Sequence, residues 1–145
     1  MTMTRGESNE STLSSRLRAA LREGPALRLA VLFGSAAAGR RRTDSDVDVA
    51  VLPLASGWDT REESALFRRL ALAASAEIDL VNLEEASTLL KWQVATTGVP
   101  LIEASSGEFA RFRARAAAEY IDFAPALRHH GEIFRRRLIE QEKGR

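Results

Sequence analysis

Apolar residues along this chain follow two spacings, and the two alternate from one stretch to the next. Short apolar runs bounded by Gly, Pro or polar residues predict β-strands. These runs are residues 27–33, 46–52, 77–81 and 99–103. The second run is the clearest, because its valines alternate with polar or small residues and so mark one face of a half-buried strand. The fourth run contains Pro100, which predicts an edge strand.

Apolar residues at helical spacing occupy the stretches between these runs. Helices are predicted from Asn9 or Ser11 to Glu23, from Thr60 to Ser75, and from Asn82 to Gly98. Thr60 and Glu63 have the spacing of a capping box at the start of the second helix. Leu66, Phe67 and Leu70 belong to its predicted buried stripe.

The C-terminal stretch keeps helical phase from Gly107 onward, and Pro125 is expected to kink or divide that helix. The order of elements therefore predicts an α+β (mixed α/β) fold, in which helices flank a small mixed β-sheet of about four strands and a long helical segment follows at the C-terminus. Residues 1–10 are polar and are expected to be a disordered tail. Residues 11–142 are expected to be a single domain with a C-terminal helical extension.

Composition narrows the possible chemistry of this 145-residue chain. The absence of Cys excludes disulfides, thiolate metal sites and cysteine nucleophiles. No apolar run approaches the roughly 18 residues that span a bilayer, and the N-terminus lacks the apolar segment of a signal peptide. We therefore expect a cytoplasmic protein that does not associate with membranes.

A Gly-Ser pair directly follows the first predicted strand. Gly34 permits a tight turn and the close approach of a ligand to the backbone, and Ser35 adds a hydroxyl beside newly exposed N–H groups. Ala36, Ala37 and Ala38 are expected to begin a helical turn whose amides point to the same place. This arrangement is typical of a site that binds phosphate.

Two carboxylates follow ten residues later, in the second predicted strand. Asp46 and Asp48 lie at positions i and i+2, so their side chains project from the same face about 6.6 Å apart. Like carboxylates repel each other unless a cation neutralises them. Hard oxygen ligands beside a phosphate site are also what Mg²⁺ prefers. The two residues therefore predict a magnesium site next to the phosphate site.

Phosphoryl transfer with two metal ions generally uses a third carboxylate. Asp79 is the best candidate, because it lies in an adjacent predicted strand between two apolar residues that point to the core. Glu77 shares its face and is the alternative.

Three consecutive arginines occupy the loop between the phosphate site and the carboxylates. Arg40, Arg41 and Arg42 could contact a triphosphate or an acidic partner, and Arg40 is assigned to nucleotide binding. In contrast, residues 43–104 carry 11 acidic and 4 basic side chains, which suits a site for divalent cations.

The combination of Gly34-Ser35, ten residues, Asp46-Val47-Asp48 and a later strand Asp resembles the signature of the DNA polymerase β-like nucleotidyltransferase superfamily. The short chain with its helical C-terminus, which contains Tyr120, Asp122 and Phe123, resembles the minimal nucleotidyltransferase (MNT) antitoxins that are encoded with HEPN-domain ribonuclease toxins.

This resemblance implies a nucleotidyltransferase fold and an enzyme that uses ATP with two Mg²⁺ ions. Ser35 would contact the terminal phosphates, Asp46 and Asp48 would hold both metals, and Asp79 would complete the metal on the nucleophile side. AMP would pass to a tyrosine of the HEPN toxin, a hetero-oligomeric partner, and silence it. Asp44 departs from the pattern by extending the alternation of acids, but only Asp46 and Asp48 fit the ten-residue spacing.

Two alternatives to this enzyme remain open. In the first, the chain neutralises its partner by binding alone, with the nucleotide site idle. In the second, it is a nucleotidyltransferase that acts on tRNA or a small molecule, although we do not favour direct binding of nucleic acid.

Overall fold

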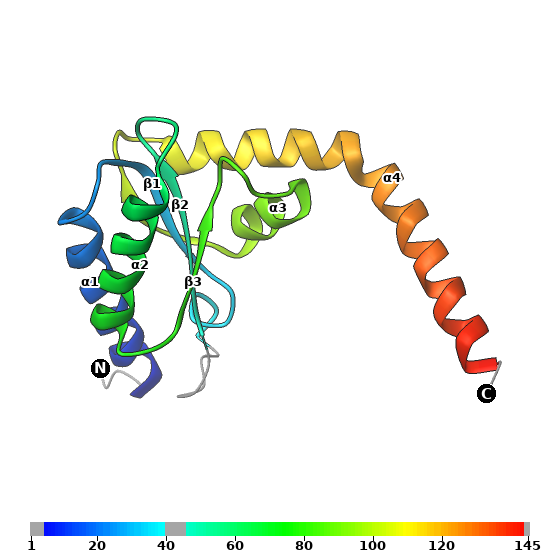
Figure 1. Ribbon diagram of the computed structural model, residues 1–145, viewed down its shortest axis with the longest axis horizontal. Coiled ribbons are helices and arrows are strands. Elements are labelled where there is room, and N and C mark those ends of the chain that lie inside the picture. The colour runs from blue at the N-terminus through cyan, green and yellow to red at the C-terminus, as the bar shows by residue number, and fades with distance from the viewer. Residues whose placement is uncertain (1–4, 40–45, 144–145) are drawn as a thin grey trace.

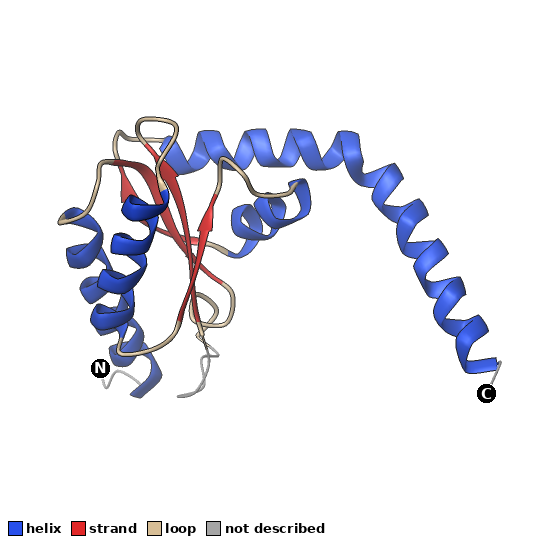
Figure 2. Ribbon diagram, viewed as in Figure 1, coloured by secondary structure: helices blue, strands red, loops and turns tan. Residues whose placement is uncertain are grey.

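A four-stranded sheet with helices on both faces forms the body of the molecule (Figures 1 and 2). The computed structural model describes residues 5–39 and 46–143. The strands are β1 (Leu27–Phe33), β2 (Val47–Pro53), β3 (Ile78–Asn82) and β4 (Val99–Glu103), and the helices are α1 (Arg5–Arg22), α2 (Thr60–Ala74), α3 (Thr88–Thr97) and α4 (Glu108–Lys143). The expected α+β fold is confirmed.

The sheet has the strand order β3-β2-β1-β4. β1 pairs antiparallel with both β2 and β4, whereas β2 and β3 are parallel and are connected through α2. The sheet is therefore mixed, as expected. β4 lies at one edge of the sheet. This position accommodates Pro100, because proline has no N–H to donate and an edge strand pairs on one side only.

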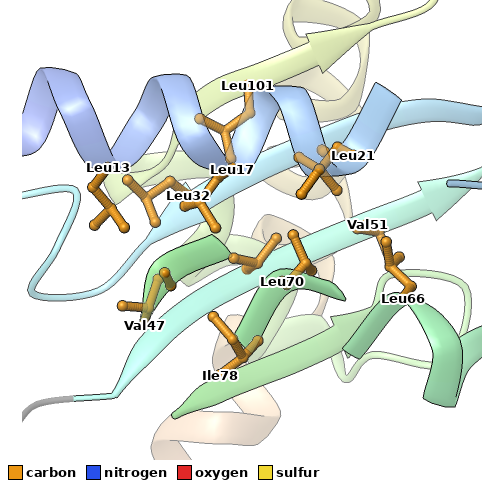
Figure 3. Close-up of a cluster of buried hydrophobic side chains, with 14 of the residues drawn as sticks. Leu13, Leu17, Leu21, Leu32, Val47, Val51, Leu66, Leu70, Ile78 and Leu101 are labelled. Carbon is orange, nitrogen blue, oxygen red and sulfur yellow. The ribbon is translucent and has the colours of Figure 1, made fainter. Parts of the chain in front are cut away.

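The two faces of the sheet carry separate apolar cores. Val47, Val49 and Val51 are at most 1% exposed and pack toward α1 and α2. Figure 3 shows this core, with leucines of α1 and α2 facing the strands. On the other face Ala50 packs with side chains of α3 and α4. The alternation of β2 therefore turns its valines to one core and its remaining side chains to the face of α3 and α4.

Three helix starts differ from the predictions. α1 begins at Arg5, so the prediction of a disordered tail is wrong for residues 5–10. Once a helix has nucleated, each residue added at its end gains a hydrogen bond for the backbone that it fixes. Polar residues can therefore extend α1 as far as Arg5. α2 is capped one residue earlier than predicted: the Asp59 carboxylate accepts from the Glu62 amide at 2.9 Å, and the Glu62 carboxylate accepts from the Asp59 amide. Both pairs have capping-box spacing, and the chain is still extended at Asp59.

The start of α3 is the third difference. Asn82 does not open this helix, because it is the last residue of β3 and its backbone pairs with Val51. Its side chain instead accepts from the Glu84 amide and forms a turn. Ser87 caps the helix through Leu90, and Gly98 ends it as predicted.

Phe67 was predicted to be buried but is 42% exposed, while its neighbours Leu66 and Leu70 fill the core. α4 is one helix that contains Pro125, and it bends in its second half, which projects away from the sheet (Figure 1). Within the described residues, none of the helices has the length and apolar character that a membrane crossing requires.

Candidate active site

The turn after β1 is fitted closely around one carboxylate of β2. Gly34 has a φ of +72°, a conformation that side chains disfavour. Phe33 and Asp48 are register partners, and a Cβ on Gly34 would collide with Oδ2 of Asp48 and lie 3.2 Å from its Cγ. Only glycine therefore lets the backbone of this turn approach the carboxylate.

The residues after Gly34 form turns rather than a continuing helix. The Ala38 amide donates to the Gly34 carbonyl at 3.3 Å, which closes one helical turn, as the run of alanines predicted. Ala36 is buried in the core under α1 and α2 and anchors this turn. Ser35 is partly exposed beside Gly34, the position at which its hydroxyl was predicted to meet a phosphate.

The parallel pairing of β2 with β3 places two acids side by side. Asp48 and Asp79 are register partners, and neighbouring strands lie about 4.8 Å apart. Asp48 is partly buried, whereas Asp46, directly before β2, and Asp79 are exposed. The fold thus joins the end of β1 and the starts of β2 and β3 at one point.

The electrostatics of Asp48 reflect this crowding. Burial raises the pKa of Asp48, the negative charges of Asp79 and Asp46 raise it further, and a hydrogen bond between the carboxyl groups of Asp48 and Asp79 acts in the same direction. Among the described ion pairs none involves these three acids. A bound cation would relieve the repulsion that the described residues leave in place.

The donor set fits Mg²⁺ in chemistry but does not form a closed cage. In the described ranges, no three His, Cys, Asp or Glu side chains gather closely enough to hold one metal ion. Mg²⁺ sites that include a nucleotide generally take one or two carboxylates and complete their shell with phosphate oxygens and water. The paired carboxyl groups of Asp48 and Asp79 meet that requirement.

Three other candidate residues of the sequence analysis are not among the described residues that meet at Gly34, Asp48 and Asp79. Glu77, the alternative to Asp79, is exposed and precedes β3, where its carbonyl accepts from the Val47 amide at 2.9 Å. Its backbone role supports the register that pairs Asp79 with Asp48. Arg40, the predicted nucleotide contact, and Asp44 lie outside the described residues.

The sequence did not predict a cavity of about 460 Å³ between α2 and β3. It is lined by Thr60, Glu63, Ser64 and Phe67 of α2 and by Ile78, Asp79 and Leu80 of β3. Phe67 was the available signal, but an aromatic residue in phase with a helix stripe reads as core.

Comparisons with known proteins agree with this geometry. The family described as "Polymerase beta, Nucleotidyltransferase" matches residues 15–107, which include all of the site residues named above. A protein adenylyltransferase MntA from Shewanella oneidensis is 43% identical over 77 residues, or 53% of this chain and 55% of that protein. The match therefore spans about half the length of that relative.

Two solved structures are similar over most of the chain. One, a toxin–antitoxin with AMP-PNP, has a TM-score of 0.73 at 30% identity and covers 83% of this chain and 98% of the matched one. The other, a tri-AMPylated Shewanella oneidensis HEPN toxin in complex with MNT antitoxin, has a TM-score of 0.64 at 28% identity and covers 89% and 98%. The resemblance to MNT antitoxins that the motif indicated is confirmed.

Proposed function

The chain belongs to the polymerase β nucleotidyltransferase family, and from this membership and the site geometry we propose that it transfers AMP from ATP to a tyrosine of a cognate HEPN toxin. In this role it is the antitoxin. One observation carries the proposal: the strand pairings bring Gly34, Asp48 and Asp79 together from three strands or strand ends. The relatives described as adenylyltransferase and as antitoxin bound to an AMPylated toxin support the choice of AMP and of a HEPN acceptor.

The turn at Gly34 and Ser35 binds the triphosphate in this proposal. Its exposed amides and hydroxyl donate to phosphate oxygens, and the missing Cβ keeps the phosphates close to Asp48. Asp46, Asp48 and Asp79 would hold two Mg²⁺ ions together with phosphate oxygens, and the bound ions would supply charge neutralisation and orientation. Arg40 is proposed as a further contact with the nucleotide.

In this proposal the acceptor enters beside Asp79, which lies on an edge strand of the sheet. The tyrosine oxygen attacks the α-phosphorus of ATP, a new O–P bond forms, and the bond from the α-phosphorus to the bridging oxygen breaks. Diphosphate leaves, and Asp79 accepts the phenolic proton. AMP added to the toxin brings negative charge, which repels RNA phosphates and accounts for neutralisation.

The test combines this protein, the cognate HEPN toxin, ATP and Mg²⁺ and follows the intact mass of the toxin. We expect a gain of one AMP for each modified tyrosine, and no gain with Asp46→Asn combined with Asp48→Asn. Asp59→Asn is the matched control. It makes the same change of Asp to Asn outside the site, and asparagine can still cap α2. An unchanged toxin mass with the unmodified protein, ATP and Mg²⁺ would refute the transfer.

A second candidate, neutralisation by binding alone, is favoured by the projecting half of α4 and by the exposure of Ile121 (70%) and Phe123 (47%) on that helix. Apolar side chains exposed on one helix are typical of a protein interface. Cell growth separates the two: if the double carboxylate variant rescues cells from the toxin fully, binding suffices and catalysis is dispensable.

A further inference from the structure

We propose that the groove between α2 and the outer edge of β3 binds the acceptor segment of the partner as an extended, positively charged polypeptide. This inference rests on the proposed function, because it names the substrate surface of the same site. The groove is the cavity of about 460 Å³ that contains Asp79 in its lining. The side chain of Asp79 lies on the face of the sheet opposite Ile78 and Leu80, so the groove adjoins the reacting centre at the edge of β3.

Among the described residues, no strand pairs with the outer edge of β3. β3 is the terminal strand of the sheet, and β2 is its neighbour there. Val47 donates to the Glu77 carbonyl and Leu83 donates to the Val51 carbonyl, both at 2.9 Å, so the odd-numbered positions of this segment face β2. Alternation along a strand then turns the peptide groups of Ile78 and Leu80, on either side of Asp79, toward the open edge. Such an edge is a template for an extended peptide.

The opposite wall of the groove supplies an apolar anchor. Phe67 is 42% exposed, although its neighbours in the helical stripe are buried. It lines the groove together with Ile78 and Leu80, while Thr60 and Ser64 add hydroxyl groups. Aromatic side chains that are left partly exposed in a hollow beside a reacting group are typical contact points for a partner.

The charge of the groove selects the kind of segment. Glu63 and Asp79 are its charged lining residues, and neither a Lys nor an Arg is among the residues that line it. A segment with Lys or Arg next to its tyrosine would therefore be favoured over an acidic one. A peptide added to β3 would lie about 4.8 Å from it, so a tyrosine opposite Asp79 would direct its ring to the face that carries the carboxylates.

The test compares variants of α2 in the transfer reaction with the cognate HEPN toxin. Phe67→Ala and Glu63→Lys are each expected to raise the KM for the toxin at least about tenfold, as loss of an anchoring contact worth about 1.4 kcal/mol does. Leu72→Ala is the matched control, because Leu72 is an apolar residue of the same helix that is 82% exposed and does not line the groove. It should leave the KM unchanged, and thermal unfolding checks that all three variants fold.

Two outcomes keep this inference separate from the proposed function. If the unmodified protein transfers AMP but both groove variants keep its KM, the groove is not the acceptor surface and the function stands. If no AMP is transferred at all, the function fails, and photo-cross-linking from benzoyl-phenylalanine at position 67 decides the groove. Capture of a tyrosine-containing basic segment of the toxin supports the inference, and capture of another segment or of nothing overturns it.

Discussion

Two acidic residues near opposite ends of β1, Glu108 of α4 and Asp48 of β2, are in opposite electrostatic situations. Near the start of β1, Arg28 lies 3.5 Å from Glu108, which also accepts from Ser105 at 2.9 Å and pairs with Arg111 at 3.2 Å. Glu108 is buried, yet its pKa is lowered, first by the hydrogen bond from Ser105 and then by the arginines. This carboxylate is satisfied by the protein itself.

Past the end of β1 the turn at Gly34 meets Asp48, whose pKa is raised by burial and by two neighbouring acids. In this region the described residues provide repulsion rather than an ion pair. The difference shows how a small domain separates tasks: one acid holds α4 to the sheet, while the other stays destabilised, as the proposed binding of a cation and a nucleotide requires. Three substitutions can break or sharpen this contrast.

The largest effect is expected for Gly34→Ala. The new Cβ would collide with the Asp48 carboxylate at a backbone φ of +72°, so the turn or the acid must move. We expect a loss of at least about 2 kcal/mol in the free energy of unfolding and a severe loss of AMP transfer. Gly57→Ala is the control, since its φ is +84° with nothing within 4 Å; it should lose only about 1 kcal/mol and keep activity. Urea unfolding and the mass assay measure both quantities, and equal losses would show that the contact with Asp48 is unimportant.

Glu108→Gln should have the second effect, a loss of stability that depends on pH. A lowered pKa means that the charged carboxylate stabilises the fold above the ordinary glutamate pKa of about 4.3, and that this contribution is lost as the pH falls through the lowered value. The variant should therefore melt below the unmodified protein at pH 7 but not at strongly acidic pH. Glu119→Gln, which removes one exposed partner of Lys91, is expected to change little. The prediction fails if the two variants melt alike at pH 7.

The smallest effect has the opposite sign. The raised pKa of Asp48 implies a cost that is absent below the ordinary aspartate pKa of about 3.9 and develops as the pH rises through the raised value. Asp48→Asn should therefore melt slightly higher than the unmodified protein at pH 7 without Mg²⁺. Adding Mg²⁺ with a non-hydrolysable ATP analogue should stabilise the unmodified protein and reverse that order. A variant that is less stable at pH 7 without Mg²⁺ would contradict a repulsive site.

Local patterns predicted most of the fold. The bounds of β1 and β4 were predicted residue for residue, because Gly, Pro and a change of polarity mark them in the chain. The predicted start of α3 was wrong, because Asn is equally common in helix caps and in turns. Asn82 lies in the sheet because it pairs with Val51, and the local sequence does not show this pairing. Phe67 was wrongly predicted to be buried, because helical phase does not show whether a neighbouring element covers a side chain.

The site was predictable in its parts rather than in its arrangement. The spacing predicted a phosphate turn at Gly34 and carboxylates at Asp46 and Asp48, and the lone acid in an apolar strand predicted Asp79; the structure brings Gly34, Asp48 and Asp79 together. That Asp79 lies opposite Asp48 depends on strand register, which the fold sets over long range. Glu108 was not singled out from the sequence: Ser105 and Arg111 are local contacts three residues away, but Arg28 meets it only after β1 and α4 pack together.

The register of β3 against β2 also determines on which face of the sheet Asp79 lies. Side chains alternate along a strand, so a slip of one residue would turn Asp79 to the opposite face, against α1 and α2. A molecule in which β3 has not docked correctly thus lacks its third acid altogether, instead of holding it slightly out of place. In the proposed function, AMP transfer would then depend on completion of the sheet, because only a correctly docked β3 presents Asp79 beside Asp48.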